Sequence, residues 1–119
     1  NDLDWKFIAT VKKSVEDNMD NPSFNVDVLC NLLNMSRTSF YNKIKALTDQ
    51  APADYIRLIR LKHAAQLLKE QKHTITEISE LTGFSDAKYF REVFKKHFDM
   101  SPSQYAKRGK EGKDDKEIK

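Results

Sequence analysis

Residues 26–55 read VDVLCNLLNMSRTSFYNKIKALTDQAPADY, and residues 75–105 read ITEISELTGFSDAKYFREVFKKHFDMSPSQY, which repeats the same pattern. Both stretches place aliphatic side chains at matching positions, and both have a serine at the eleventh position, before the second stretch gains one residue. Beyond that residue the matched pairs are Phe40 with Phe90, Ile44 with Phe94, Pro52 with Pro102, and Tyr55 with Tyr105. A repeat of this size indicates one supersecondary unit used twice.

Each copy is predicted to form a short helix, a tight turn and a second helix, which is the layout of a helix-turn-helix motif. Asn34 and Gly83 occupy matching positions, and both residue types tolerate the left-handed conformation that ends a helix. Ser36 and Ser85 follow, and we expect them to cap the second helices. The two copies therefore predict the same turn twice.

The whole chain is predicted to be all-α. Its 119 residues suffice for one compact domain or for two small ones that share a core. Only three glycines and three prolines occur, and alternating β-branched runs are absent. About seven helices are expected, at residues 3–19, 26–33, 37–48, 53–70, 86–98 and 102–107, with a further one that begins after Thr74. The predicted architecture is homeodomain-like, with two helix-turn-helix subdomains joined by a long central helix.

The expected organisation has five parts. They are an N-terminal helix and loop (1–23), a first helix-turn-helix (24–51), a linker helix (52–73), a second helix-turn-helix (74–107) and a charged tail (108–119). The linker helix is apolar on more than one side, which predicts a strut packed against both motifs. Its length is about 27 Å, and adjacent turns of a duplex are about 34 Å apart. The tail carries many charges and a single apolar residue, so we expect it to be disordered.

The net charge of +3 is modest, but its distribution is uneven. The first 20 residues hold five acids against three bases, whereas residues 37–48 hold three bases and no acid. An acidic N-terminal segment followed by a basic helix at residues 37–48 favours a surface that binds a polyanion. Scattered solvated charge is the alternative explanation.

No residues of this chain form a recognisable catalytic or metal-binding pattern. A single cysteine excludes a disulfide framework and a cysteine-rich zinc site, and the three histidines lack metal-ligand spacing. Cys30 lies on the apolar stripe of its helix, which favours an inert core thiol over an alkyl-accepting nucleophile. We therefore expect no enzyme activity and no cofactor. The sequence contains no long apolar stretch and begins at Asn1, so it is expected to be a cytoplasmic piece of a longer protein.

A family resemblance follows from two runs, Arg60-x-x-x-Ala64-x-x-Leu67-Leu68 and the longer run from Gly83-Phe84-Ser85 to Ser101-Pro102 and Tyr105. They resemble the AraC/XylS family of transcription regulators over about residues 25–107. The run from Ser36 to Thr48, together with the extra first helix, looks like the C-terminal output domain of hybrid two-component sensors. The resemblance implies sequence-specific binding of double-stranded DNA. It also implies a full-length parent that can carry histidine kinase activity and a membrane anchor.

The resemblance also implies partners. They are a promoter operator contacted in two adjacent major grooves, RNA polymerase, and sensor and receiver regions missing from this chain, through which a homodimer can form. The chain departs from the family at Asp49 and Asp99, where glycine is common, and at Glu92, where a basic or polar residue is common. The alternative from a different class is a helical protein-binding module that does not bind DNA.

The residues predicted to contact DNA lie on the outward faces of the second helix of each copy, opposite the apolar positions such as Phe40, Ile44 and Leu47. They are Arg37, Thr38, Ser39, Tyr41, Asn42, Lys45, Ala87, Lys88, Arg91, Glu92, Lys95 and Lys96. Six of them fall, by resemblance, on base-reading positions: Thr38, Tyr41, Asn42, Lys88, Arg91 and Glu92. Candidates for phosphate contacts or structural ion pairs are Arg57, Arg60, Lys62 and Lys96.

Their chemistry suits base edges in the major groove. Arg37 can take guanine bidentately and Asn42 can take adenine, while Thr38 or Tyr41 can touch a thymine methyl group. The carboxylate of Glu92 repels phosphate, yet it can accept a hydrogen bond from the amino group of cytosine. The alternative interpretation is that these residues only form solvated polar faces.

Overall fold

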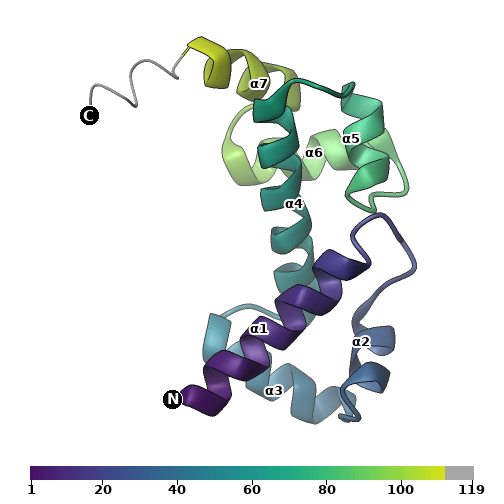
Figure 1. Cartoon of the computed structure of the whole chain (residues 1–119), viewed down its shortest axis with the longest axis vertical. Coiled ribbons are helices and arrows are strands. Elements are labelled where there is room, and N and C mark those ends of the chain that lie inside the picture. The colour runs from purple at the N-terminus through teal and green to yellow at the C-terminus, as the bar shows by residue number, and fades with distance from the viewer. Residues whose placement is uncertain (112–119) are drawn as a thin grey trace. The chain divides into compact units, whose positions relative to one another are not determined.

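The computed structural model describes the fold of residues 1–111 and the side chains of residues 1–109. Seven α-helices and no strand occur in this described part, which confirms the predicted all-α class. The helices are α1 (Asp2–Asp17), α2 (Val26–Leu32), α3 (Arg37–Thr48), α4 (Pro52–Glu70), α5 (Ile75–Leu81), α6 (Ala87–Phe98) and α7 (Pro102–Glu111) (Figure 1). Helices α2 and α3 form one helix-turn-helix, and α5 and α6 form the other.

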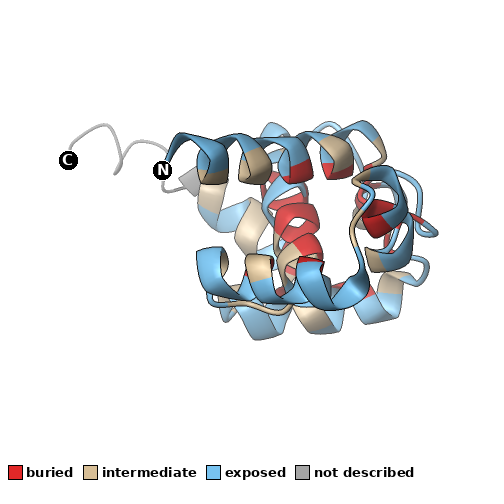
Figure 2. Cartoon of the chain, turned by 90° about the horizontal axis from the view of Figure 1, so that it is seen from below, coloured by how far each residue is buried: buried red, intermediate tan, exposed pale blue. Residues whose placement is uncertain are grey.

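The chain divides into two compact units, the first from Asn1 to Arg60 and the second from Leu61 onward. The boundary falls inside α4, so the first half of this helix belongs to one unit and the second half to the other. Each half buries its own apolar residues, which explains why the sequence of α4 is apolar on more than one side. Buried positions recur on one side of the amphipathic helices and exposed positions on the other (Figure 2).

The core of the first unit is formed by side chains from α1, α2, α3 and the start of α4. Its fully buried members include Val11 and Val15 of α1, Leu29 of α2, and Ile44 of α3. Phe7 contacts the buried Phe40 ring edge-on, with 6.1 Å between the ring centroids. Helix α1 thus packs directly on the back of α3 and belongs to the core of this unit.

The core of the second unit is more aromatic. Phe90 and Phe94 of α6 are fully buried, and their ring centroids lie 5.7 Å apart. Phe98 and Tyr105 extend this aromatic cluster, since the centroid of each ring lies within 5.4 Å of the centroid of the Phe94 ring. Edge-on and tilted ring contacts add to the stabilisation that burial of the ring surface provides, and they hold α6 against α7.

The turn between the two helices of each motif has the same hydrogen bonds in both copies. Asn34 (φ 54°) donates to the carbonyl of Asn31, and Met35 donates to that of Cys30. The corresponding bonds in the second copy run from Gly83 (φ 78°) to Glu80 and from Phe84 to Ser79. These paired bonds define a Schellman motif, and they confirm the predicted left-handed residue at both turns.

The second copy differs from the prediction at its cap. Ser36 caps α3 as expected, but Asp86, not Ser85, caps α6, and its carboxylate accepts a hydrogen bond from the N–H of Lys88. The prediction for Ser85 was wrong because the second copy has one residue more than the first, and this extra residue lies before the cap of α6. Two other differences concern burial and length. Leu47 is 37% exposed and is not buried with Phe40 and Ile44, and α1 ends at Asp17 instead of about residue 19.

The last helix is longer than the sequence indicated. Helix α7 runs to Glu111, so residues 108–111, which were assigned to a disordered tail, are helical. Lys and Arg are good helix formers, and Tyr105 and Ala106 pack on the core of the second unit and hold the helix in place. The remainder of the predicted tail, residues 112–119, lies outside the described residues.

Candidate nucleic-acid interface

Helix α3 is capped at both ends and buries its apolar side, so its polar side faces outward. The hydroxyl of Ser36 accepts the N–H of Ser39 at 3.1 Å, and Asp49 ends the helix in the left-handed conformation (φ 59°). Phe40 and Ile44 are buried beneath it. The opposite face exposes all six positions predicted to contact DNA on this helix: Arg37, Thr38, Ser39, Tyr41, Asn42 and Lys45.

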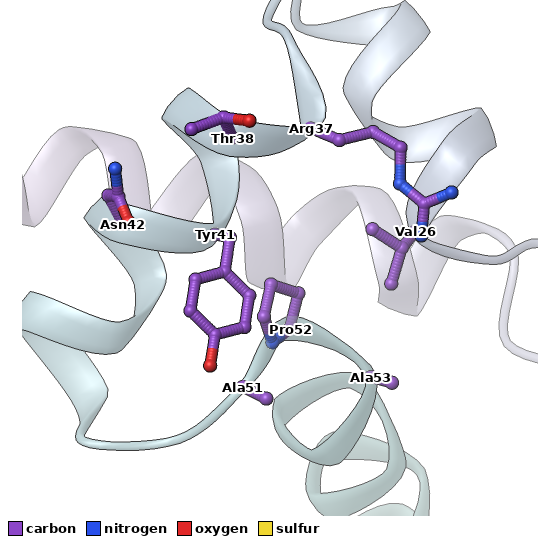
Figure 3. Close-up of a pocket in the computed structure, with 8 residues that line it drawn as sticks. All are labelled: Val26, Arg37, Thr38, Tyr41, Asn42, Ala51, Pro52 and Ala53. Carbon is purple, nitrogen blue, oxygen red and sulfur yellow. The ribbon is translucent and has the colours of Figure 1, made fainter.

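A groove of about 410 Å³ borders this face, between α3 and the beginning of α4. It is lined by Val26, Arg37, Thr38, Tyr41, Asn42, Ala51, Pro52 and Ala53. The ring of Tyr41 points toward Pro52, whereas Thr38 and Asn42 point away from it and into solvent (Figure 3). An open groove beside two polar side chains is suited to the edge of an extended ligand.

The three cations of α3 already have partners within the first unit. Arg37 turns toward α2 and pairs with Asp27 at 3.2 Å, which separates its guanidinium from Asn42 (Figure 3). Lys45 lies 4.0 Å from the carboxylate of Asp49. The ammonium of Lys43 lies 4.4 Å from the centre of the Phe7 ring, a cation–π contact. The pairs with Asp27 and Asp49 are exposed, so each stabilises the fold by less than about 1 kcal/mol.

Helix α6 carries the other six predicted contacts and has a different electrostatic character. Lys88, Arg91, Glu92, Lys95 and Lys96 are exposed, and Ala87 is half-buried. Within residues 1–109 none of these five charged groups takes part in an ion pair. The face of α6 therefore presents four cations and one carboxylate directly to solvent.

Arg60, which the sequence assigned equally to phosphate contact or to bracing the fold, is buried, with 5% of its surface exposed. Its guanidinium donates to the carbonyls of Met19, Asn21 and Phe24, at 2.6, 3.0 and 3.1 Å. Burial lowers the pKa of Arg60, and the nearby carboxylate of Asp20 opposes that shift. Arg60 thus anchors the loop between α1 and α2 and is not placed to meet a phosphate.

Burial raises the pKa of Cys30, which therefore remains a protonated thiol at neutral pH. A protonated, buried thiol is a poor nucleophile, which agrees with the assignment of Cys30 to the core. Among the described residues, no three His, Cys, Asp or Glu side chains are grouped as metal ligands would be. None of the helices described is both long and apolar enough to span a membrane.

The sequence did not point to the start of α4 as part of this region. Ala51, Pro52 and Ala53 line the same groove as Tyr41 and Asn42. A signal was present, because Pro52 has its counterpart in Pro102 and each proline begins a helix. The repeat implied a helix start here, but only the folded chain brings it beside α3.

Comparison with protein families gives a match to a model described as a helix-turn-helix domain, over residues 29–108. Over 106 residues the chain is 45% identical to histidine kinase P4 of Formosa agariphila, covering 89% of this chain and 8% of that protein. It is 34% identical to the Msm operon regulatory protein of Streptococcus mutans, covering 85% of this chain and 36% of that protein. The chain thus spans much less than two thirds of the length of either relative.

Solved structures of the same architecture include the C-terminal domain of the two-component response regulator YesN from Fusobacterium nucleatum. Its TM-score is 0.77 at 27% identity, covering 85% of this chain and 98% of that one. The DNA-binding domain of AdpA, solved in complex with a target DNA, also gives a TM-score of 0.77, at 25% identity, and covers 86% of this chain and 93% of that one.

Proposed function

The chain belongs to the AraC-type family of helix-turn-helix domains, and from this membership we propose that α3 and α6 are the two helices that read its DNA. The domain binds double-stranded DNA and regulates transcription. The observation that carries the proposal is the duplicated, capped helix with its polar side exposed, at residues 37–48 and again at 87–98. A recognition helix enters the major groove with residues near its N-terminus at the base edges.

The proposed division of roles follows from how the side chains lie. Thr38 and Asn42 point freely into solvent and are proposed to contact bases. Arg37, Ser39, Tyr41 and Lys45 are proposed to contact the adjoining backbone or base edges. On α6 the proposed contacts are Ala87, Lys88, Arg91, Glu92, Lys95 and Lys96. Arg60 is removed from the phosphate candidates because it is buried.

The test is a selection from a random duplex pool with the 119-residue chain at moderate salt. Two enriched half-motifs about ten base pairs apart are expected if both helices read adjacent turns of the major groove. Asn42→Ala should then weaken the selected duplex by about 1–3 kcal/mol and relax the sequence preference in one half-motif. An equal loss on every sequence would contradict base reading by Asn42.

The absence of any salt-dependent duplex binding would instead support the rival function, a helical module that binds protein. DNA binding through phosphates weakens steeply as salt rises. A titration of plain duplex DNA at several salt concentrations therefore separates the two classes, whichever sequences the selection returns.

We also propose that this domain is the output part of a larger two-component sensor. The 45% identity to a histidine kinase and the likeness to the YesN domain support this. In that setting the parent's other regions would form a homodimer and the domain would act on RNA polymerase at a promoter. Phosphorylation of the full-length parent should change its occupancy of the selected duplex, as footprinting would measure, and unchanged occupancy would contradict this role.

A further inference from the structure

The caps of α3 and α6 fix an exact correspondence between the two reading helices. Phe40 donates to the carbonyl of Ser36 at 3.0 Å, and Phe90 donates to that of Asp86 at 2.9 Å. Both helices have 12 residues, and both end in a left-handed aspartate. Counted from these caps, Asn42 and Glu92 are each the sixth residue. The two side chains therefore hold the same position on equivalent helices.

Glu92 is exposed, and its nearest cations on the same helix face leave it free. Lys88 and Lys96 lie one turn to either side, a spacing at which ion pairs commonly form. Neither pairs with Glu92 within 4.0 Å in the part of the chain that the structure describes. A carboxylate that only neutralised its neighbours would be expected to lie against them.

The surrounding charge offsets the repulsion between this carboxylate and phosphate. Helix α6 presents four exposed cations, whereas the three cations of α3 are engaged by Asp27, Asp49 and the Phe7 ring. Attraction between unit charges at the surface falls with distance and is screened by salt. Four cations near one carboxylate keep the face of α6 net positive, so a duplex can approach closely enough for Glu92 to meet a base.

We propose that Glu92 selects a cytosine in the half-site beneath α6, an inference that rests on the proposed function of that helix. An ionised carboxylate can only accept hydrogen bonds. In the major groove guanine offers acceptors alone, and adenine places its N7 acceptor beside its amino group. Cytosine offers its amino donor, so it is the base that a carboxylate fits best. Asn42 both donates and accepts, which suits adenine, so the two half-sites differ at this equivalent position.

The experiment repeats the duplex selection with the wild-type chain, Glu92→Gln and a control, Glu80→Gln. Glu80 is an exposed acid on α5, so the control removes the same charge from the same unit outside α6. The wild-type selection should contain one cytosine position that becomes adenine for Glu92→Gln, because a glutamine pairs bidentately with adenine. On duplexes that differ only there, each protein should prefer its own base by about tenfold or more. The selection with Glu80→Gln should still return cytosine at that position.

Glu92→Gln could instead raise the affinity for all duplexes equally and leave the cytosine position unchanged. That result would mean that Glu92 only repels phosphate, and it would overturn the inference. If the selections return two half-motifs but no position in either responds to Glu92→Gln, the inference is overturned while the proposed function stands. A wild-type selection that enriches no sequence would overturn the proposed function, and the inference with it. Circular dichroism confirms that each exposed-site variant is folded.

Discussion

A buried arginine shows at the residue scale how burial decides between two roles. Arg57 and Arg60 lie three residues apart on α4, and their sequence setting allowed phosphate contact or a structural role for both. In the folded chain Arg57 pairs locally with Asp54 at 2.5 Å and remains partly exposed, whereas Arg60 satisfies three loop carbonyls in the interior. A buried acceptor that loses its donor retains the cost of leaving water.

Arg60→Ala should therefore lower the free energy of unfolding by about 2–4 kcal/mol, since three carbonyls lose a hydrogen bond from the guanidinium and the loop between α1 and α2 is released. Urea denaturation followed by circular dichroism measures this change. Arg57→Ala is the matched control on the same helix and should cost less than about 1 kcal/mol. Equal effects of the two changes would show that Arg60 does not brace this loop.

At the scale of single helices, the backbone conformation of the residue after each helix decides how the helix ends. Among residues 1–111, five have positive φ angles: Asn34, Asp49, Gln71, Gly83 and Asp99. Each lies just beyond the end of a helix, where a left-handed residue turns the chain away. Asparagine, aspartate and glycine could be anticipated there from their tolerance of this conformation. Gln71 was not anticipated, because nothing in a glutamine favours it.

Gly83→Ala should lower the free energy of unfolding by about 1–2 kcal/mol, because an alanine is strained at φ 78°. Gly109→Ala is the matched control. It lies inside α7, where an added methyl group would meet Lys69 at an ordinary contact distance of 3.7 Å. That change should stabilise the fold by up to about 1 kcal/mol. Destabilisation of similar size at both glycines would contradict this account of the turn.

At the scale of the whole molecule, the two reading helices differ in how their charges are engaged, because the three cations of α3 have partners and the charged groups of α6 form no ion pair among the described residues. Lys96 is exposed on α6 and has no ion-pair partner among the described residues. A cation that contacts phosphate releases a counterion when DNA binds, so its removal reduces the dependence of affinity on salt. The net charge of +3 does not reveal this, because acids and bases are distributed unevenly.

Lys96→Ala should weaken all duplexes alike and reduce the slope of log affinity against log salt by about one. Fluorescence anisotropy at several salt concentrations gives this slope. Lys12→Ala, at an exposed position of α1, removes an equal charge from a helix that is not proposed to contact DNA and should leave the slope nearly unchanged. A slope that Lys96→Ala does not alter would exclude Lys96 from the phosphate contacts.

The sequence by itself determined the elements and the outward faces of α3 and α6. The repeat, the helical periodicity and the cap residues are local properties, since they depend on residues within a turn or two of each other. They therefore predicted seven helices and the two turns, and they placed the polar positions of both reading helices on an exposed side.

Only the tertiary structure decided the roles that depend on residues far apart in the chain. The loop carbonyls that hold Arg60 are 36 to 41 residues away from it, and Phe7 reaches Lys43 and Phe40 from a helix outside the repeat. Leu47 is exposed although its spacing suits the buried stripe, because burial depends on which neighbouring helix covers a position. Periodicity records which side of a helix is apolar, whereas packing decides what that side meets.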